Sequence, residues 1–239
     1  MLQFERQEAI LRILEDKKNA SIRELAAQLF TSEASIRRDI EVLEQQGLVK
    51  RVYGGVLLSR YENEVVPVRL RDSDHSAVKE EIARRAAAMI QDGDTIIMDA
   101  SSTVRRVLKY ITHRRNLKII TNNLRIFSDY TGNNIQLYCT GGTYSAGNHA
   151  FTGPSAENYL RTISADYLFF SSQGITADGI ISDVSEEETA LRRVMIARTA
   201  KQFFLCDSSK IGLQKLFTLC NKDDITGVIC DARLPWEEE

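Results

Sequence analysis

The segment from Ser21 to Gly55 constrains the fold of this chain most, because it joins two helical patterns to a short alternating one. Ser21 and Glu24 form a Ser-x-x-Glu capping box, which predicts where the first helix begins. Ser32 is suited to cap a second helix, whose apolar residues recur every three or four positions. The spacing therefore predicts a helix-turn-helix, and an earlier apolar helix would close a three-helix core. The core positions expected in these helices are Phe4, Ile10, Ile13, Leu14, Ile22, Leu25, Ala26, Leu29, Ile36, Ile40 and Leu43.

The outward face of the second helix carries the residue types that DNA recognition requires. Short polar and Arg side chains there can reach base edges and phosphates, although Arg38 could pair with Asp39 instead. Residues 48–58 alternate around a Gly pair, which predicts a β-hairpin wing with basic residues. The alternative is an ordinary helical hairpin with solvated charges. We expect DNA contacts from Ser32, Ser35, Arg37, Arg38, Lys50, Arg51, Tyr53, Gly54 and Gly55.

The charge balance indicates that any attraction to DNA is local. The 239-residue chain has a formal net charge of −2, and residues 1–60 hold ten Lys/Arg against nine Asp/Glu. A nearly neutral N-terminal region must therefore attract phosphates through the cluster of Arg37, Arg38, Lys50 and Arg51.

The cysteines and histidines show no metal-binding pattern. Cys139, Cys206, Cys220 and Cys230 lack C-x-x-C spacing, which favours buried free thiols in a reducing compartment. The three His residues show no ligand spacing either, so we expect no metal and no cofactor. The sequence shows no apolar signal segment and no run of membrane-spanning length, which predicts a cytoplasmic protein without a membrane partner.

Beyond residue 58 the pattern changes from a polar linker to alternating helices and short buried strands. Such alternation predicts a mostly parallel sheet covered by helices, an α/β domain. We expect helices at 78–91, 102–112, 123–130, 155–163 and 186–200, and strands at Thr95–Met98, Leu117–Thr121, Ile135–Cys139, Tyr167–Ser171, Phe203–Cys206 and Val228–Cys230. The predicted organisation is a winged helix-turn-helix domain at 1–58, a linker at 59–75 and the α/β domain at 76–239.

Small polar residues follow the predicted strands, where ligands bind in open α/β sheets. Ser101–Thr103 at a helix N-terminus would suit a phosphate, and Lys210 would add a full charge. Asp99 and Asn122 could order sugar hydroxyls, so the chemistry suits a phosphorylated polyol. Each feature also has a structural interpretation, as a helix cap, a turn or a solvated lysine. Glu186–Glu188 are expected to favour the start of the following helix rather than catalysis.

Two sets of motifs carry a family resemblance that covers nearly the whole chain. The run SEASIRRDIEVLEQQGLVKRVYGG resembles the DNA-binding head of DeoR-type bacterial transcriptional regulators, with Tyr53 where His is usual. DGDTIIMDASSTV, LKIITNN, ADYLFFSSQGI, EEETALRRVMI and LCDSSKIG resemble the family's sugar-phosphate sensor domain, a fold related to ribose-phosphate isomerase. Ser101 replaces a Gly common in that loop. The resemblance implies effector contacts from Asp99, Ser101, Ser102, Thr103, Thr121, Asn122, Gly141, Gly142, Gly174 and Lys210.

These features together predict a homo-oligomeric transcriptional regulator that binds double-stranded operator DNA. The resemblance implies a repressor of carbohydrate-metabolism genes that a phosphorylated sugar releases. One alternative is a sugar-phosphate isomerase-like enzyme, in which Asp99 and Lys210 would serve as base and enediolate stabiliser. Another is an architectural DNA-binding protein. We favour the regulator, because a DNA-binding head gives an isomerase no advantage and an architectural protein needs no polar strand ends.

Overall fold

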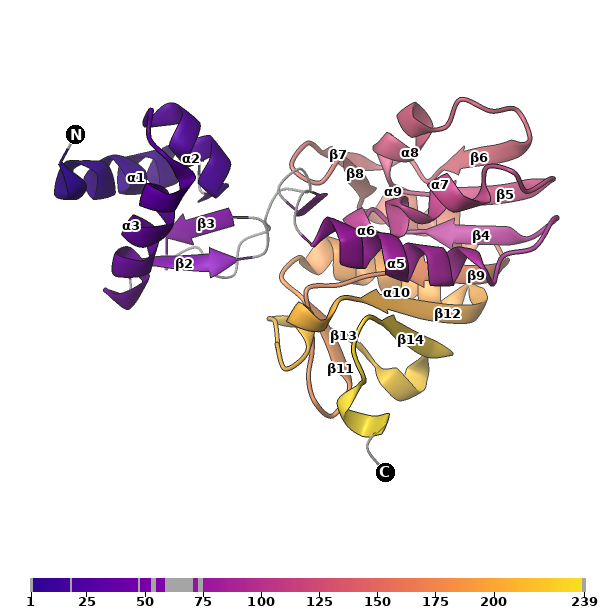
Figure 1. Ribbon diagram of the computed structural model, residues 1–239. Helices are drawn as coiled ribbons and strands as arrows, with labels where there is room; N and C mark the ends of the chain where they lie inside the picture. The colour runs from indigo at the N-terminus through magenta and orange to yellow at the C-terminus, as the bar shows by residue number, and fades with distance from the viewer. Residues whose placement is uncertain are drawn as a thin grey trace. The chain divides into compact units, whose positions relative to one another are not determined.

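The computed structural model in Figure 1 describes residues 2–17, 19–46, 48–52, 55–58, 71–72 and 75–237. The chain divides into two compact units, Met1–Asp74 and His75–Glu239. The first is called the head below, and the second the α/β domain. Most of the predicted linker, including residues 59–70, lies outside the described part of the chain.

The head is a three-helix core with a small antiparallel sheet. Its helices bury one apolar face each, and the predicted stripe of the second helix is confirmed, since Ile36, Ile40 and Leu43 are at most 2% exposed. The expectation that Phe4 belongs to this core is wrong, because Phe4 is 60% exposed. The sheet has the strand order β1-β3-β2. The elements are α1 (Gln3–Lys17), β1 (Asn19–Ala20), α2 (Ile22–Gln28), α3 (Glu33–Gln45), β2 (Val49–Val52) and β3 (Gly55–Leu58).

Both predicted helix caps of the head are confirmed. The Ser21 hydroxyl accepts the backbone N–H of Glu24 at 3.1 Å, and the Glu24 carboxylate accepts that of Ser21 at 2.9 Å. Ser32 accepts the backbone N–H of Ser35 at 3.2 Å and so caps α3. These bonds satisfy N–H groups that the first helical turn leaves without an intrahelical acceptor.

The wing contains one strand more than the sequence predicts. β1 pairs with β3, so that Ala20 lies opposite Val56. Two residues are too short for a period-2 pattern to be recognised, which is why the sequence analysis missed this strand. The pairing brings the two backbones together at Gly55, where a Cβ would lie 2.7 Å from the carbonyl oxygen of Ala20. Gly55 is therefore required by strand packing.

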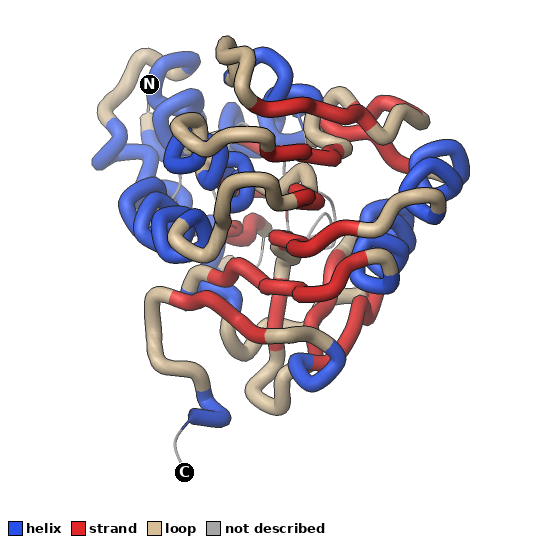
Figure 2. The backbone as a smooth tube through the Cα atoms, turned by 90° about the vertical axis from the view of Figure 1, so that its right-hand side faces the viewer, coloured by secondary structure: helices blue, strands red, loops and turns tan. Residues whose placement is uncertain are grey.

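The α/β domain is built on a six-stranded sheet in which every strand pair is parallel. Figure 2 shows helices on either side of the stacked strands. The strand order is β14-β12-β9-β4-β5-β6. Its strands are β4 (Thr95–Met98), β5 (Leu117–Thr121), β6 (Ile135–Cys139), β9 (Ala165–Phe170), β12 (Thr199–Cys206) and β14 (Gly227–Cys230).

Alternate residues of each strand supply two separate cores. Ile96 and Met98 face one core, which the helices α5 to α8 cover, whereas Ile97 between them faces the other, which α9 and α10 cover. Burial on both faces explains why the strands read as continuous apolar runs. The helices are α5 (Ser76–Ala87), α6 (Ser102–Arg105), α7 (Val107–Ile111), α8 (Leu124–Asp129), α9 (Pro154–Arg161) and α10 (Glu186–Ala197).

The structure departs from the predicted elements of the α/β domain in three places. The helix expected at 186–200 ends at Ala197, and residues 199 and 200 begin β12 instead. The helix expected at 102–112 is divided into α6 and α7 at Arg106. Two antiparallel sheets were also missed, because their strands are short and lie in segments that resemble turns. They are β7 (Thr143–Ser145) with β8 (Ala150–Thr152), and β10 (Gly174–Ile175) with β11 (Ile180–Asp183) and β13 (Phe217–Asn221).

Replacing Gly55 by Ala should destabilise the head by about 1–3 kcal/mol, because the new Cβ must displace the β1 backbone. Gly147→Ala is the control, since a Cβ there meets no atom within 4 Å. Urea unfolding followed by circular dichroism measures both variants. Equal stabilities of the two would contradict the packing role of Gly55.

Candidate DNA-binding and effector-binding sites

The exposed arginines of α3 differ in their contacts. Arg37 pairs with Glu33 at 2.8 Å, and both side chains are exposed. Arg38 is exposed and has no ion pair with any described residue. Ser32 is exposed and Ser35 half-buried, with their hydroxyls 2.9 Å apart at the start of α3. The four predicted residues of this helix therefore lie at its N-cap and in its first two turns.

Asp39 does not pair with Arg38. Its side chain is 1% exposed and accepts two hydrogen bonds from Arg6 of α1, to Oδ2 at 2.5 Å and to Oδ1 at 3.2 Å. The hydrogen bond to Asp39 raises the pKa of Arg6, although burial opposes it. These two hydrogen bonds fix α3 against α1. Because they occupy Asp39, they also exclude it as the partner of Arg38. The sequence gives no sign of this pairing, because 33 positions separate Arg6 from Asp39.

The wing residues are only partly available for DNA. Lys50 and Arg51 are both exposed, and Arg51 pairs with Glu44 of α3 at 3.1 Å. Tyr53 and Gly54 lie outside the described residues. A phosphate reaching Arg51 would compete with the Glu44 carboxylate.

A buried ion cluster joins the carboxyl edge of the parallel sheet to α10. The Arg192 guanidinium donates to Asp99 at 2.8 Å, to Asp183 at 3.0 Å and to Glu188 at 2.7 Å. All four side chains are at most 9% exposed. Burial lowers the pKa of Arg192, but the three carboxylates outweigh it, and the net shift is upward. The guanidinium therefore stays charged under all ordinary conditions.

Asp99 also connects this cluster to two other predicted effector residues. Its Oδ1 accepts the backbone N–H of Ser101 at 3.0 Å, and its Oδ2 accepts that of Ser171 at 3.1 Å. The Ser171 hydroxyl accepts a hydrogen bond from Lys210 Nζ at 2.8 Å. The Lys210 side chain is only 13% exposed, so the interpretation of a solvated lysine is wrong. The structure thus brings Asp99, Ser101 and Lys210 together.

Among the predicted effector residues, two have a buried polar atom without a hydrogen-bond partner in the described part of the chain. These atoms are Thr103 Oγ1 and Asn122 Oδ1, and their residues are 1% and 3% exposed. The Asn122 Nδ2 group is satisfied, since it donates to the Phe151 carbonyl at 3.0 Å. Buried polar atoms in folded proteins are nearly always paired, and exceptions mark places where an outside group can bond.

The remaining polar candidates have local structural roles. Ser101 caps α6 by accepting the backbone N–H of Val104 at 3.2 Å. Ser102 follows as the first residue of α6 and is buried. Thr121 Oγ1 accepts the backbone N–H of Asn123 at 3.0 Å, at the end of β5. These bonds shape the loops that present Thr103 and Asn122.

The three candidate glycines differ in the space around their Cα atoms. A Cβ on Gly142 would lie 2.5 Å from the Thr152 carbonyl oxygen, and one on Gly174 would lie 2.4 Å from that of Leu213. Protein backbone therefore fills the space that a side chain would take at both. Gly141 has a φ of +62° and no atom within 4 Å of a Cβ, so its backbone is open to an approaching group.

Several residues of this edge were missed by sequence reasoning. Arg192 lies in the quoted motif EEETALRRVMI but was given no role there, and Asp183 and Asn148 belong to no quoted motif. Glu188 was interpreted as a helix-end charge. Glu186 and Glu187 are exposed in the first turn of α10 as expected, but Glu188 is buried and accepts from Asn148 at 2.5 Å. The only signal was the i,i+4 spacing of Glu188 and Arg192, which surface pairs share.

The four cysteines are free thiols as expected, but only two of them are buried. Cys206 and Cys230 are buried, Cys220 is intermediate and Cys139 is exposed at the end of β6. The described residues contain no cluster of three or more metal-ligating side chains. None of the described helices is long and apolar enough to cross a bilayer.

A winged helix-turn-helix followed by a helix-covered parallel sheet defines a two-domain transcriptional regulator that binds DNA. Comparisons with known families agree. The DeoR-like helix-turn-helix domain matches residues 6–61, and the DeoR C terminal sensor domain matches residues 74–232. The chain belongs to the DeoR family of transcriptional regulators.

Characterised relatives match almost end to end. The chain is 31% identical over 235 residues to the HTH-type transcriptional regulator GolR of Listeria innocua, covering 98% of this chain and 92% of that protein. It is 31% identical over 230 residues to the transcriptional repressor AccR of Agrobacterium fabrum, covering 95% and 89%. The lactose phosphotransferase system repressor of Staphylococcus epidermidis is 27% identical over 235 residues, covering 97% and 93%.

Solved structures overlap the chain more loosely. D-Ribose-5-phosphate isomerase in complex with phospho-erythronic acid covers 57% of this chain and 54% of its own, with a TM-score of 0.42 and 11% identity. The eIF2B delta protein from Chaetomium thermophilum covers 83% and 63%, with a TM-score of 0.49 and 17% identity. Overlaps this weak do not indicate a shared activity.

Replacing Arg192 by Met should destabilise the α/β domain by about 3–5 kcal/mol, because it leaves three carboxylates buried without their cation. Arg161→Met is the control, since Arg161 forms an exposed i,i+4 pair with Glu157 and its loss should cost less than about 1 kcal/mol. Chemical unfolding monitored by fluorescence compares the two. A small effect of Arg192→Met would show that the cluster is not held by its arginine.

Proposed function

We propose that the protein is a transcriptional repressor of carbohydrate-metabolism genes that leaves its operator when a phosphorylated sugar binds the α/β domain. The sugar would bind at the carboxyl edge of the sheet, beside the loops after β4, β5 and β12. Two relatives are named as repressors, one of them of a lactose phosphotransferase system. We place this activity in the cytoplasm, where operator DNA and phosphorylated sugars occur together.

The DNA-binding part of the proposal rests on Arg38. An exposed arginine whose neighbouring carboxylate is already held by Arg6 can present its full fork to a base or a phosphate. Arg37 and Arg51 each pair with a glutamate and would exchange that partner for a phosphate. Lys50 adds phosphate attraction on the wing. One head contacts little DNA, so we propose that paired heads of a homo-oligomer occupy repeated half-sites.

The effector part of the proposal is carried by one observation, the buried and unpartnered Thr103 Oγ1 and Asn122 Oδ1. Both belong to loops at the carboxyl edge, where α/β sheets bind ligands. Sugar hydroxyls can donate to Asn122 Oδ1, and an ester phosphate can accept from the Thr103 hydroxyl. Lys210 supplies a partly buried positive charge near the same edge. Gly141 leaves its backbone open to the ligand.

Asp99 takes a different part in this proposal from the one that the sequence suggested. Both of its oxygens accept from protein donors, and its side chain is 1% exposed. We therefore assign it the role of positioning the Ser101 and Ser171 loops instead of touching sugar hydroxyls. The same engagement leaves Asp99 poorly suited to act as the base of an isomerase, which requires a carboxylate within reach of a substrate proton.

Release from DNA requires the effector to prefer the arrangement that does not bind the operator. A ligand with equal affinity for both arrangements shifts nothing, and about 1.4 kcal/mol of preference gives a tenfold release. Thermal-shift screening of sugar phosphates, followed by operator release and turnover assays, tests this function. Turnover of a stabilising sugar would favour the enzyme, and no shift with any sugar phosphate would favour a protein that senses nothing.

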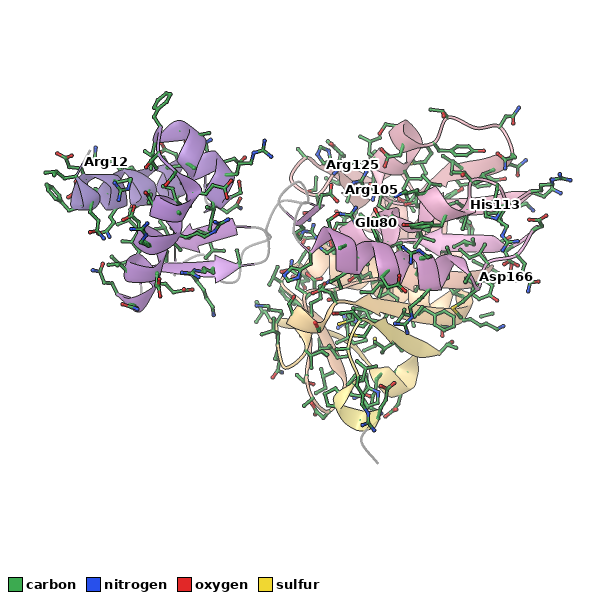
Figure 3. All side chains as sticks on the ribbon, in the orientation of Figure 1. Arg12, Glu80, Arg105, His113, Arg125 and Asp166 are labelled. Carbon is green, nitrogen blue, oxygen red and sulfur yellow. The ribbon has the colours of Figure 1, made fainter. Side chains whose placement is uncertain are left out.

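Arg38→Ala should weaken binding to the operator by about 1–3 kcal/mol if Arg38 reads a base. Arg12→Ala is the matched control, because Arg12 is an exposed arginine of α1 with a weak pair to Glu8 at 3.4 Å (Figure 3). Fluorescence anisotropy with operator and scrambled duplexes measures the effect. Undiminished operator preference in Arg38→Ala would remove Arg38 from the recognition surface.

Thr103→Val should weaken the response to the effector and leave the fold intact. Its hydroxyl has no protein partner in the described residues, so the loss should cost no stability, whereas the lost ligand bond should raise the releasing concentration about five- to tenfold. Thr189→Val is the stability control, because the equally buried Thr189 hydroxyl donates to the Ser185 carbonyl at 2.7 Å. Unfolding and operator-release titrations together decide the case. An unchanged release midpoint in Thr103→Val would exclude Thr103 as a ligand.

A further inference from the structure

One long segment of the α/β domain lacks charge altogether. Residues 130–156 contain no Lys, Arg, Asp or Glu over 27 positions, although charged residues make up 27% of the chain. The segment includes strand β6, the β7–β8 hairpin and the start of α9. Depletion of charge with retention of aromatic residues is the composition of the centre of a protein–protein interface.

The segment contains an open sheet edge. β6 is the last strand of the six-stranded sheet and pairs only with β5 among the described strands (Figure 1). No backbone hydrogen bond links its residues to any other described element. Natural edge strands are protected by charges, prolines, bulges or a covering element. β6, with the sequence Ile-Gln-Leu-Tyr-Cys, has no charge and no proline.

The face of the sheet beside this edge is also incompletely covered. Tyr138 lies next to Ile120 of β5 in the strand register, and yet Ile120 is 3% exposed whereas Tyr138 is 39% exposed. A hollow of about 290 Å³ lies beside Tyr138. Its lining comes from the sheet and the end of α9: Thr95, Lys118, Ile120, Tyr138, Tyr159, Ile163 and Ser164. Tyr144 of β7 is another exposed aromatic residue of the segment, at 43%.

The helical surface on the other side of the sheet shows what the solvated surface of this domain looks like. Arg105 pairs with Asp129 at 2.6 Å, and Arg106 pairs with Glu80 at 3.3 Å. Figure 3 shows Glu80 and Arg105 on these helices. The uncharged segment therefore has fewer charged residues than another surface of its own domain, and not only fewer than protein surfaces in general.

We infer that β6 and the exposed Tyr138 that it carries form the surface through which two copies of this chain associate. An edge strand is complementary to itself, because two copies related by a two-fold axis pair antiparallel and exchange their free N–H and C=O groups. The absence of charge means that identical copies meet without repulsion there. The pairing would extend two six-stranded sheets into one.

This inference concerns assembly and does not depend on the identity of the effector. If the Tyr138 variants assemble like the parent, the tests of Arg38 and Thr103 are unaffected. If it holds, the α/β domains would supply the paired heads that the proposed operator binding requires.

Charge placed on β6 tests the surface in the full-length protein by sedimentation velocity. The parent should sediment as a dimer or a larger even-numbered species at micromolar concentration. Tyr138→Lys should sediment as the next smaller species, with self-association weakened about tenfold or more, because antiparallel pairing of two short strands brings the added charges of the two copies close to each other. Tyr138→Glu should do the same. An equimolar mixture of the two variants should recover the parental species, which also shows that both are folded.

Leu216→Lys is the matched control, since Leu216 is 69% exposed and lies outside the uncharged segment. It should sediment like the parent. The inference is overturned by a monomeric parent at tens of micromolar, by Tyr138→Lys and Tyr138→Glu variants that assemble like the parent, or by an equal loss in Leu216→Lys. A folded variant mixture that stays dissociated would also overturn it, because complementary charges should restore an isologous contact.

Discussion

The hydrogen-bonded ion cluster of Arg192 determines how the carboxyl edge of the α/β domain is arranged. One guanidinium holds carboxylates from the end of β4, from β11 and from its own helix α10. The cluster carries two more negative than positive charges, so its burial requires further donors. Backbone N–H groups of Ser101 and Ser171 supply them to Asp99, and those of Val184 and Ser185 supply them to Asp183. Charge-assisted bonds of this kind offset the desolvation of buried carboxylates.

The result is a frame of hydrogen-bonded loops in which a few buried polar atoms have no hydrogen-bond partner among the described residues. The loops after β4 and β9 are tied to Asp99, and Lys210 is tied to the second of these loops through Ser171. Thr103 and Asn122 lie in this frame with buried oxygens that no described protein group meets. A frame held by these bonds would lose little conformational entropy on binding the proposed effector, which would favour affinity. It also separates the residues that shape the site from those proposed to touch the effector.

The head follows the same principle at a smaller scale. Asp39 lies next to Arg38 in the sequence, yet it is buried and held by Arg6 from another helix. Arg6 thereby positions α3 and leaves Arg38 exposed on the outer face. Adjacent residues thus have opposite functions: Asp39 orients the recognition helix, and Arg38 is proposed to contact DNA.

The sequence by itself determined the class of fold, the helix caps of the head and all six strands of the parallel sheet, because these depend on local spacing and on continuous apolar runs. It also located polar residues at the strand ends. Only the tertiary structure decided what each of them does, since the partners come from distant parts of the chain. Arg192 reaches Asp99 across 93 positions, Gly142 and Gly174 are required by backbone that packs against them, and β1 forms only by pairing with β3. Such contacts leave no periodic signal, because they depend on which loops the folded sheet brings together.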